Sequence, residues 1–302
     1  MDSTEKMTDL RYLRPRTIED ACALLREHGE AAHVVAGGTA FVLMMQQRLI
    51  EPRVIISLQD VGAHDKSPWS GITVDRRTTH IAAGTTLTDI AISPDVRRRH
   101  PALATAAGLV GNPRIRNVAT IGGNLAEADY ASDPPSALIS LDAVCVIQGS
   151  DGVRELPVSQ LLTGFYSTAL QPDELITAVL VPRPQGDERS LHTRFVSRSS
   201  EDRPCVVVSA SGRLRNGSIK NLRVVVGAAA PTPLEFPEII DTLVDCGIPD
   251  DHTVESVAGS LADQIEPIED QRGSAWYRRQ MVRVHVGLTI RAFLAGEGRA
   301  EQ

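Results

Sequence analysis

Cysteine and aromatic residues are scarce in this sequence. Its 302 residues include four cysteines and only 4% aromatic residues. Cys22, Cys145, Cys205 and Cys246 lie far apart, and none has the CxxC spacing typical of zinc sites, redox pairs or iron–sulfur clusters. We therefore expect that the chain alone holds no metal and that its cysteines are buried thiols.

Long hydrophobic runs are absent as well. No apolar stretch approaches the ~20 residues of a membrane-spanning helix, and residues 1–16 lack the apolar segment of a secretion signal. The 31 basic and 38 acidic side chains give a net charge of −7, which argues against nucleic-acid binding. Hydrophobic residues make up 42% of the chain, enough for a sizeable core. We predict a cytoplasmic globular protein with no transmembrane segment and no nucleic-acid partner.

Several common catalytic motifs are also missing. The sequence contains no GxxxxGK[ST], GxGxxG, HExxH or GxSxG motif. Its eight histidines show no spacing suited to a metal site. We therefore predict no catalytic residue and no metal ligand in this chain.

Helical and strand-like segments alternate over the first part of the chain, which indicates α/β organisation there. The hydrophobic spacing and the capping residues decide where each element begins and ends. In chain order we expect a helix between Thr17 and Gly29, strands over 33–36 and 54–58 around a helix over 40–49, a hairpin of 72–74 and 80–82, helices starting at Leu87 and Pro94, helices over 103–110 and 134–141, and a strand over 143–148.

The segment 182–187 is rich in proline, glycine and polar residues and is the best candidate for a domain boundary. The predicted domains therefore cover residues 1–186 and 187–302. Strands followed by helices suggest that the second domain is α+β. Its expected elements are strands over 194–197, 206–214 and 222–228, a turn at Asn216-Gly217, and helices over 253–265 and 275–294.

Two segments with paired glycines stand out. Glycine permits positive φ angles and close approach of a ligand, and successive N–H groups in such turns can bind an anion, especially at a helix N-terminus. Two such segments, with Asp133 nine residues beyond the second, could hold the two phosphates of one dinucleotide. Double glycines also occur in ordinary tight turns, so the residues alone indicate a phosphate-binding α/β protein at most. The first segment is Ala36, Gly37, Gly38, Thr39 and Ala40, and the second is Thr120, Ile121, Gly122, Gly123 and Asn124.

These segments and others resemble a known protein family. The chain is similar, in order and spacing, to the FAD-binding medium subunit of the molybdenum hydroxylases, which include xanthine dehydrogenase and carbon monoxide dehydrogenase. The resemblance covers nearly the whole chain. It is carried by AGGT at 36–39 through RL at 48–49 and ISL at 56–58, IRNVATIGGNLA at 115–126, ASDPP at 131–135, TAL at 168–170, DELI at 173–176, VP at 181–182 and YRRQM at 277–281.

The resemblance implies an α+β fold in two domains. Residues 1–186 would form an FAD-binding PCMH-type (vanillyl-alcohol-oxidase-like) domain, whose two α/β subdomains sandwich FAD. Residues 187–302 would form a C-terminal α+β domain of the carbon monoxide dehydrogenase flavoprotein type.

The resemblance also implies cofactors and partners. A large partner subunit would hold molybdopterin, and a small partner subunit would hold two [2Fe–2S] clusters. This chain would bind FAD, take electrons from the clusters and pass them to an external acceptor. The family leads us to expect a heterotrimer that pairs as an (αβγ)2 assembly.

Site residues follow from the same resemblance. Residues 36–40 and 120–124 would hold the FAD pyrophosphate, and Asp133 would bind a sugar hydroxyl or order the second segment. Ile176 would pack near the flavin ring. Arg194 would approach the ring and stabilise the anionic reduced form, although an exposed strand arginine is an equal alternative.

Two other functions stay open on the sequence. One is a self-contained FAD oxidase of the vanillyl-alcohol-oxidase-like fold, which would need a substrate cavity and often a covalent His or Cys attachment. The other is a nucleotide-binding scaffold without a redox role. The paired glycine segments and Asp133 argue against the scaffold.

Overall fold

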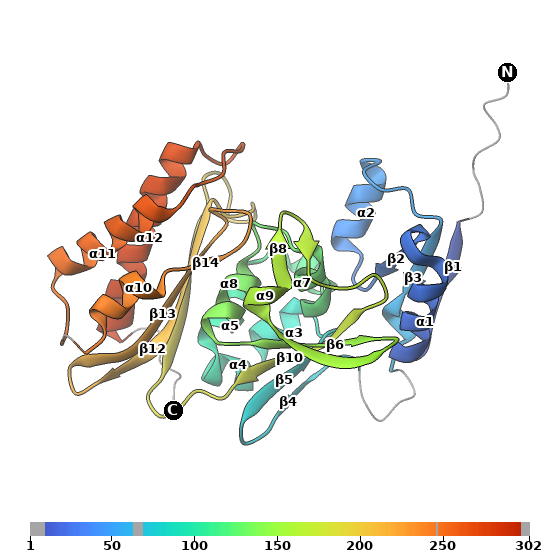
Figure 1. The fold of residues 1–302 in the computed structure, drawn as a ribbon, viewed down its shortest axis with the longest axis horizontal. Helices are drawn as coiled ribbons and strands as arrows, with labels where there is room; N and C mark the ends of the chain where they lie inside the picture. The colour runs from blue at the N-terminus through green and yellow to red at the C-terminus, as the bar shows by residue number, and fades with distance from the viewer. Residues whose placement is uncertain (1–9, 63–68, 246, 297–302) are drawn as a thin grey trace.

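The computed structural model describes residues 10–62, 69–245 and 247–296. Three sheets with their helices lie in a row, with the N-terminal and C-terminal sheets at opposite ends (Figure 1). Cys22, Cys145 and Cys205 are buried and free, as expected, and Cys246 lies outside the described residues. No described helix is both long and apolar enough to cross a bilayer.

The N-terminal sheet has three parallel strands in the order β1-β3-β2. The predicted first helix is confirmed: Thr17 caps it through Asp20 N–H, and Gly29 ends it at φ +50°. Its apolar face packs on β3, where Val54 and Ile56 are buried. The elements are β1 (Arg11–Leu13), α1 (Ile18–His28), η1 (Gly29–Ala31), β2 (Ala32–Val35), α2 (Thr39–Gln46), β3 (Val54–Ser57) and η2 (Leu58–Asp60).

The middle sheet has five antiparallel strands in the order β4-β5-β10-β6-β7. Short helices pack against it around buried Leu103, Leu138 and Val179. The strands are β4 (Ile72–Val74), β5 (Thr78–Ala82), β6 (Val144–Gly149), β7 (Gly152–Pro157) and β10 (Leu175–Pro182), with a separate pair β8 (Leu162–Gly164) and β9 (Ser167–Thr168). The helices are α3 (Leu87–Ile92), α4 (Pro94–Arg99), α5 (Pro101–Leu109), α6 (Pro113–Arg116), α7 (Ile121–Glu127), α8 (Asp133–Ser140) and α9 (Val158–Leu161).

The C-terminal sheet has four antiparallel strands in the order β11-β12-β13-β14 and its own core. The turn predicted at Asn216-Gly217 joins β12 to β13 with positive φ at both residues, as a tight hairpin requires. The elements are β11 (Arg189–Phe195), β12 (Val206–Arg215), β13 (Ser218–Gly227), β14 (Leu234–Glu235), α10 (Pro237–Ile240), η3 (Asp241–Leu243), α11 (Asp251–Gln264) and α12 (Ala275–Ala295).

The C-terminal sheet packs between two layers of helices. Its outer side is covered by α11 and α12, and its inner side meets α5 and α8 of the middle part (Figure 1). A Cβ atom on Gly227 would lie 2.1 Å from Ser136 Oγ, so β13 and α8 approach each other closely. This contact fixes the C-terminal sheet against the helices that follow the second glycine segment.

The α+β class expected from the sequence is confirmed, but several elements differ from those expected, and the strands β1, β7, β8, β9 and β10 are additional to the predicted ones. The strand expected over 194–197 begins at Arg189 instead. Its first half was missed because the buried residues Ser190 and His192 are polar and add nothing to the hydrophobic pattern. The fourth strand, β14, was not expected, since it has only two residues. Gly122 and Gly123 lie inside the first turn of α7.

Candidate functional site

The fold brings the two glycine segments together. A Cβ atom on Gly37 would lie 1.9 Å from Val118 O and 3.0 Å from Ala119 Cα, so only glycine permits this packing. Ala119 immediately precedes the second segment. Residues 82 positions apart in the sequence, Gly37 and Ala119, therefore form one surface.

The first segment presents the start of a helix. Gly38 has φ +71° and forms the N-cap of α2, and Val42 N–H donates to Gly38 O (2.9 Å). The first N–H groups of an α-helix have no partner within the helix and carry a partial positive charge. The N–H groups of Thr39 and Ala40 are in this position, and their binding of an anion stays a prediction.

The second segment differs from the expected anion-binding turn. Four successive N–H groups already have acceptors in the protein: Ile121 donates to Thr85 O (3.0 Å), Gly122 to Ala83 O (2.9 Å), Gly123 to Thr120 Oγ1 (3.1 Å) and Asn124 to Thr120 O (2.9 Å). The first two bonds hold α7 against the residues that follow β5, and the other two close its first turn on Thr120. The hydroxyl proton of Thr120 is left to donate, so this segment offers a side chain rather than free amides.

Asn124 and Asp133 have different partners from those expected. The Asn124 amide and the Ser132 hydroxyl lie 2.9–3.0 Å apart, so Ser132 orders the end of the second segment. Asp133 is only 2% exposed, and its carboxylate turns to the C-terminal sheet. Its Oδ1 lies 3.0 Å from His192 Nε2 and its Oδ2 3.4 Å from Arg194. Asp133 therefore joins the two parts of the chain.

Arg194 is buried, so the alternative that it is an exposed strand residue is wrong. Its side chain is 7% exposed, and its guanidinium donates to Leu109 O and Asp202 O besides contacting Asp133. Arg194 Nε is buried and has no hydrogen-bond partner among the described residues. One donor of this arginine thus faces no acceptor in the part of the chain that the structure describes.

Ile176 lies on the central strand β10 and is 4% exposed. It packs in the core of the middle sheet next to a bulge at Thr177. The neighbouring Thr177 O accepts from Ala83 N–H (2.9 Å), and Ala83 O accepts from Gly122 N–H, so the strand and the second segment are linked. Contact of Ile176 with a flavin ring stays a prediction.

His192 was not expected to take part in this site. Its imidazole is fully buried, faces Asp133 through Nε2 and lies 2.8 Å from Ser209 Oγ through Nδ1. A carboxylate only accepts hydrogen bonds, so Nε2 carries the proton. The spacing of Ser190, His192 and Arg194 puts the three polar side chains on one face of β11. That period of two is the signal that could have identified them.

A second polar contact between the two parts lies just beyond α7. The Tyr130 hydroxyl donates to Asp270 Oδ2 (2.8 Å), and the fully buried Arg278 donates to Asp270 Oδ1 (2.9 Å). Burial alone raises the pKa of Asp270, but hydrogen bonds from the Arg272 amide, Arg278 and Tyr130 outweigh it and hold that pKa well below its usual range. Asp270 therefore stays charged and anchors the C-terminal part.

The residues around the glycine segments fit a dinucleotide. The α2 amides and the Thr120 hydroxyl suit phosphate, and the partly exposed Val118 (47%) and Ile115 (37%) offer apolar contact to a planar ring. The unpaired Arg194 Nε suits an acceptor on such a ring. Within the described ranges, no group of three or more His, Cys, Asp or Glu side chains is arranged to hold a metal.

Comparison with known proteins gives matches along nearly the whole chain. Residues 6–184 match the model described as the FAD binding domain in molybdopterin dehydrogenase, and residues 192–294 match the CO dehydrogenase flavoprotein C-terminal domain. The nicotine 6-hydroxylase medium subunit of Paenarthrobacter nicotinovorans is 32% identical, covering 94% of this chain and 97% of that protein.

Two carbon monoxide dehydrogenases are similar as well. The medium chain from Afipia carboxidovorans is 31% identical, over 90% of this chain and 92% of that protein. A solved structure of carbon monoxide dehydrogenase from Hydrogenophaga pseudoflava, which lacks the Mo-pyranopterin moiety of its cofactor, contains a chain with a TM-score of 0.90 and 28% identity. This match covers 95% of the present chain and 98% of that one.

Proposed function

Because the chain belongs to the family of FAD-binding medium subunits of molybdopterin dehydrogenases, we propose that it transfers electrons within a heterotrimeric molybdenum hydroxylase. Family membership confirms the resemblance inferred from the sequence and makes the chain a flavoprotein subunit. In the proposal, electrons pass from [2Fe–2S] clusters of a small partner subunit through FAD to an external acceptor. A large partner subunit holds molybdopterin.

The meeting of the two glycine segments is the observation that carries this proposal. In it, the N–H groups of Thr39 and Ala40 hold one phosphate and the Thr120 hydroxyl donates to the other. Arg194 Nε donates to the flavin ring, and FAD supplies the capacity to accept and release electrons. The Asp133 carboxylate keeps Arg194 and His192 in position rather than binding a sugar.

The apolar helix α2 supports the proposed partners. None of its eight residues is buried, although they include Phe41, Val42, Leu43, Met44 and Met45. Val42 and Leu43 are 50% and 47% exposed. Exposed apolar patches of this kind mark surfaces that another molecule covers, and a partner subunit beside the flavin is the covering molecule in this proposal.

Three further parts of the proposal concern the whole assembly. The domains are taken as residues 1–186 and 187–302, and the family models end at 184 and begin at 192. The assembly is taken as (αβγ)2, and its location as the cytoplasm. The described helices include none that could span a bilayer.

The first test is the visible spectrum of the purified chain after incubation with FAD and desalting. We expect flavin bands near ~450 nm at about one flavin per chain. A Gly38→Val variant should lose them, because φ is +71° there and the side chain would disturb the N-terminus of α2. Gly217→Val is the matched control, since Gly217 also has φ +71° but lies in the β12–β13 turn.

Two results would contradict the proposal. If the Gly38→Val variant still binds one flavin per chain, the first glycine segment is not part of the binding site. If the isolated chain retains no flavin, the same spectrum is measured after co-expression with the two partner subunits, because burial by a partner can complete a site. Absence of flavin from that complex would overturn the function.

A further inference from the structure

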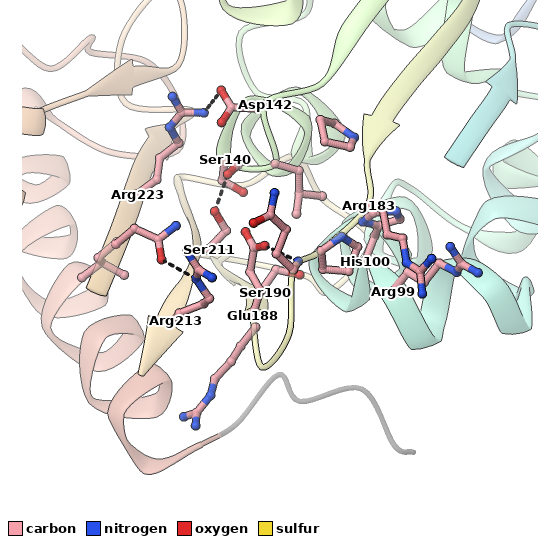
Figure 2. A pocket seen from close by; sticks show the side chains of 17 residues that line it. Arg99, His100, Ser140, Asp142, Arg183, Glu188, Ser190, Ser211, Arg213 and Arg223 are labelled. Atoms are coloured by element: carbon pink, nitrogen blue, oxygen red, sulfur yellow. Dashed lines mark hydrogen bonds and ion pairs between the residues drawn. The ribbon is translucent and has the colours of Figure 1, made fainter. Parts of the chain in front are cut away.

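A separate cavity lies where the middle part of the chain meets the C-terminal sheet. Its volume is about 470 Å³, within the range of sites for small molecules. Arg213 and Arg223 stand on strands of the C-terminal sheet at one side, and Arg99, His100 and Arg183 stand at the other (Figure 2). None of the residues in either glycine segment lines this cavity.

The cavity concentrates positive charge in a chain whose net charge is −7. Five arginines line it against two carboxylates, Asp142 and Glu188. Asp142 forms an ion pair with Arg223. The Glu188 carboxylate accepts a hydrogen bond from Gln185 N–H (2.9 Å). With five arginines against two carboxylates, the lining carries an excess of positive charge.

Three of the arginines have little or no compensation. Arg183 and Arg213 form no ion pair with any residue that the structure describes, and Arg99 comes only within 4.0 Å of Asp95. Arg99 Nη1 is buried without a hydrogen-bond partner in the described chain. Guanidinium groups in this state favour an anion, because charge-assisted hydrogen bonds to phosphate or carboxylate are strong.

His100 adds a buried polar atom to the same wall. The residue is 0% exposed, and its Nε2 lies 2.9 Å from Thr79 Oγ1. Its Nδ1 has no partner among the described residues. His100 also precedes α5, whose second residue donates to Ser190 Oγ on the cavity wall. Buried polar atoms in native proteins are normally satisfied by protein, water or ligand, so an oxygen-rich ligand fits here.

We propose that this cavity binds a compact polyanion bearing phosphate or carboxylate groups. Its guanidinium contacts come from both parts of the chain, with Arg99 and Arg183 on one side and Arg213 on the other. Bound polyanion would hold the two parts together at a place distinct from the glycine segments. The proposal does not depend on the proposed function, since no residue is shared between the two sites.

The test is isothermal titration calorimetry of the full chain with pyrophosphate and, separately, with citrate. We expect one binding event per chain that weakens as salt is added, because salt screens exposed charges. Arg99→Ala and Arg213→Ala should each weaken it about tenfold, from the loss of a charged hydrogen bond. Preference for pyrophosphate or citrate tells which of the two anionic groups the cavity takes.

Arg98→Ala is the matched control. Arg98 is the neighbour of Arg99 in α4, is 55% exposed and pairs with Asp95, so its removal should leave the affinity unchanged. Circular dichroism of each variant checks that the chain stays folded. Failure of both probes to bind, or equal weakening by Arg98→Ala, would overturn the proposal. Competition by FAD would place pyrophosphate at the glycine segments and would overturn it as well.

Discussion

Gly122 and Gly123 are neighbours in α7, but an added methyl group would meet different surroundings at each. At Gly122 it would lie 2.6 Å from Ala83 Cβ and 3.0 Å from Ala83 O, and at Gly123 it would lie 3.0 Å from Thr120 Oγ1 only. We expect Gly122→Ala to lower the free energy of unfolding by about 1–3 kcal/mol through overpacking. Gly123→Ala should change it by less than about 1 kcal/mol, since alanine favours a helix. Urea denaturation measures both, and equal losses would contradict this account of the packing.

Asp133 offers the second prediction for a single residue. Replacing it by asparagine would leave the 7%-exposed Arg194 side chain without its carboxylate, and breaking a buried pair in this way costs about 3 kcal/mol. Asp142→Asn is the control, because Asp142 pairs with Arg223 but is 72% exposed, and exposed pairs contribute about 0–1 kcal/mol. Similar urea midpoints for the two variants would show that the Asp133 junction contributes no more than a surface pair.

At the scale of single residues, some site residues could be predicted from the sequence, but the residues they contact in the fold could not. The paired glycines could be found because glycine adjacency is visible in one segment. That Gly37 packs on Val118 and that Asp133 faces His192 could not be found, since both depend on how distant elements dock. Two of the four occupied N–H groups of the second segment likewise depend on Ala83 and Thr85, which follow β5 and lie about 40 residues earlier.

Among the elements, α2 gives the third prediction. Leu43→Glu should change the free energy of unfolding of the isolated chain by no more than about 0.5 kcal/mol, because α2 buries no side chain. In the co-expressed complex, the same variant should recover several-fold less of the partner subunits, since a charge would be buried at their contact. Affinity chromatography of the complex measures the recovery.

Trp276→Glu is the control for α2. Trp276 is 70% exposed and lies on α12, which packs on the C-terminal sheet away from α2 (Figure 1). It tests whether the loss of any exposed apolar side chain reduces assembly. Full recovery of partners with Leu43→Glu would show that α2 is not the covered surface.

Elements with strong local signals could be predicted from the sequence, and those defined by partners could not. Thr17 and Thr86 cap α1 and α3 as expected, because a cap is a contact within four residues. β7 was missed because its residues are half-exposed and begin with glycine. β11 was placed five residues too late, since Arg189, Ser190 and His192 are buried through contacts with other elements.

The response of the whole molecule to pH follows from His100. Burial and the neighbouring Arg99 lower the pKa of His100 to about 4, below the ~6.5 of an exposed histidine. Between these values the unfolded chain takes up a proton that the folded chain does not, so the free energy of unfolding falls as the pH falls. This amounts to about 2 kcal/mol between pH ~7 and ~5. His285, whose pKa burial also lowers, acts in the same direction.

His100→Asn tests this prediction, because asparagine can still face Thr79 but does not titrate in this range. Urea denaturation at the two pH values should show a smaller drop for the variant than for the natural chain, by about the 2 kcal/mol assigned to His100. The same drop in both would mean that other groups cause the acid sensitivity.

On the scale of the whole chain, the order and type of its domains could be predicted, because the motifs of the family run through the sequence in order. Their relative placement could not. It depends on the approach of Gly227 to Ser136 and on the Asp133 and Asp270 contacts, each of which joins residues far apart in the sequence.

Residues that meet in the folded chain are synthesised well apart in time. The contact of Gly37 with Val118 needs the first 118 residues, and that of Asp133 with Arg194 needs 194 of the 302. At ~5–20 residues per second, the apolar α2 is made roughly 7 to 30 seconds before β11. Until β11 is made, the nascent chain cannot form the Asp133–Arg194 contact. A binding surface that includes Arg194 is therefore completed only once residue 194 has been made.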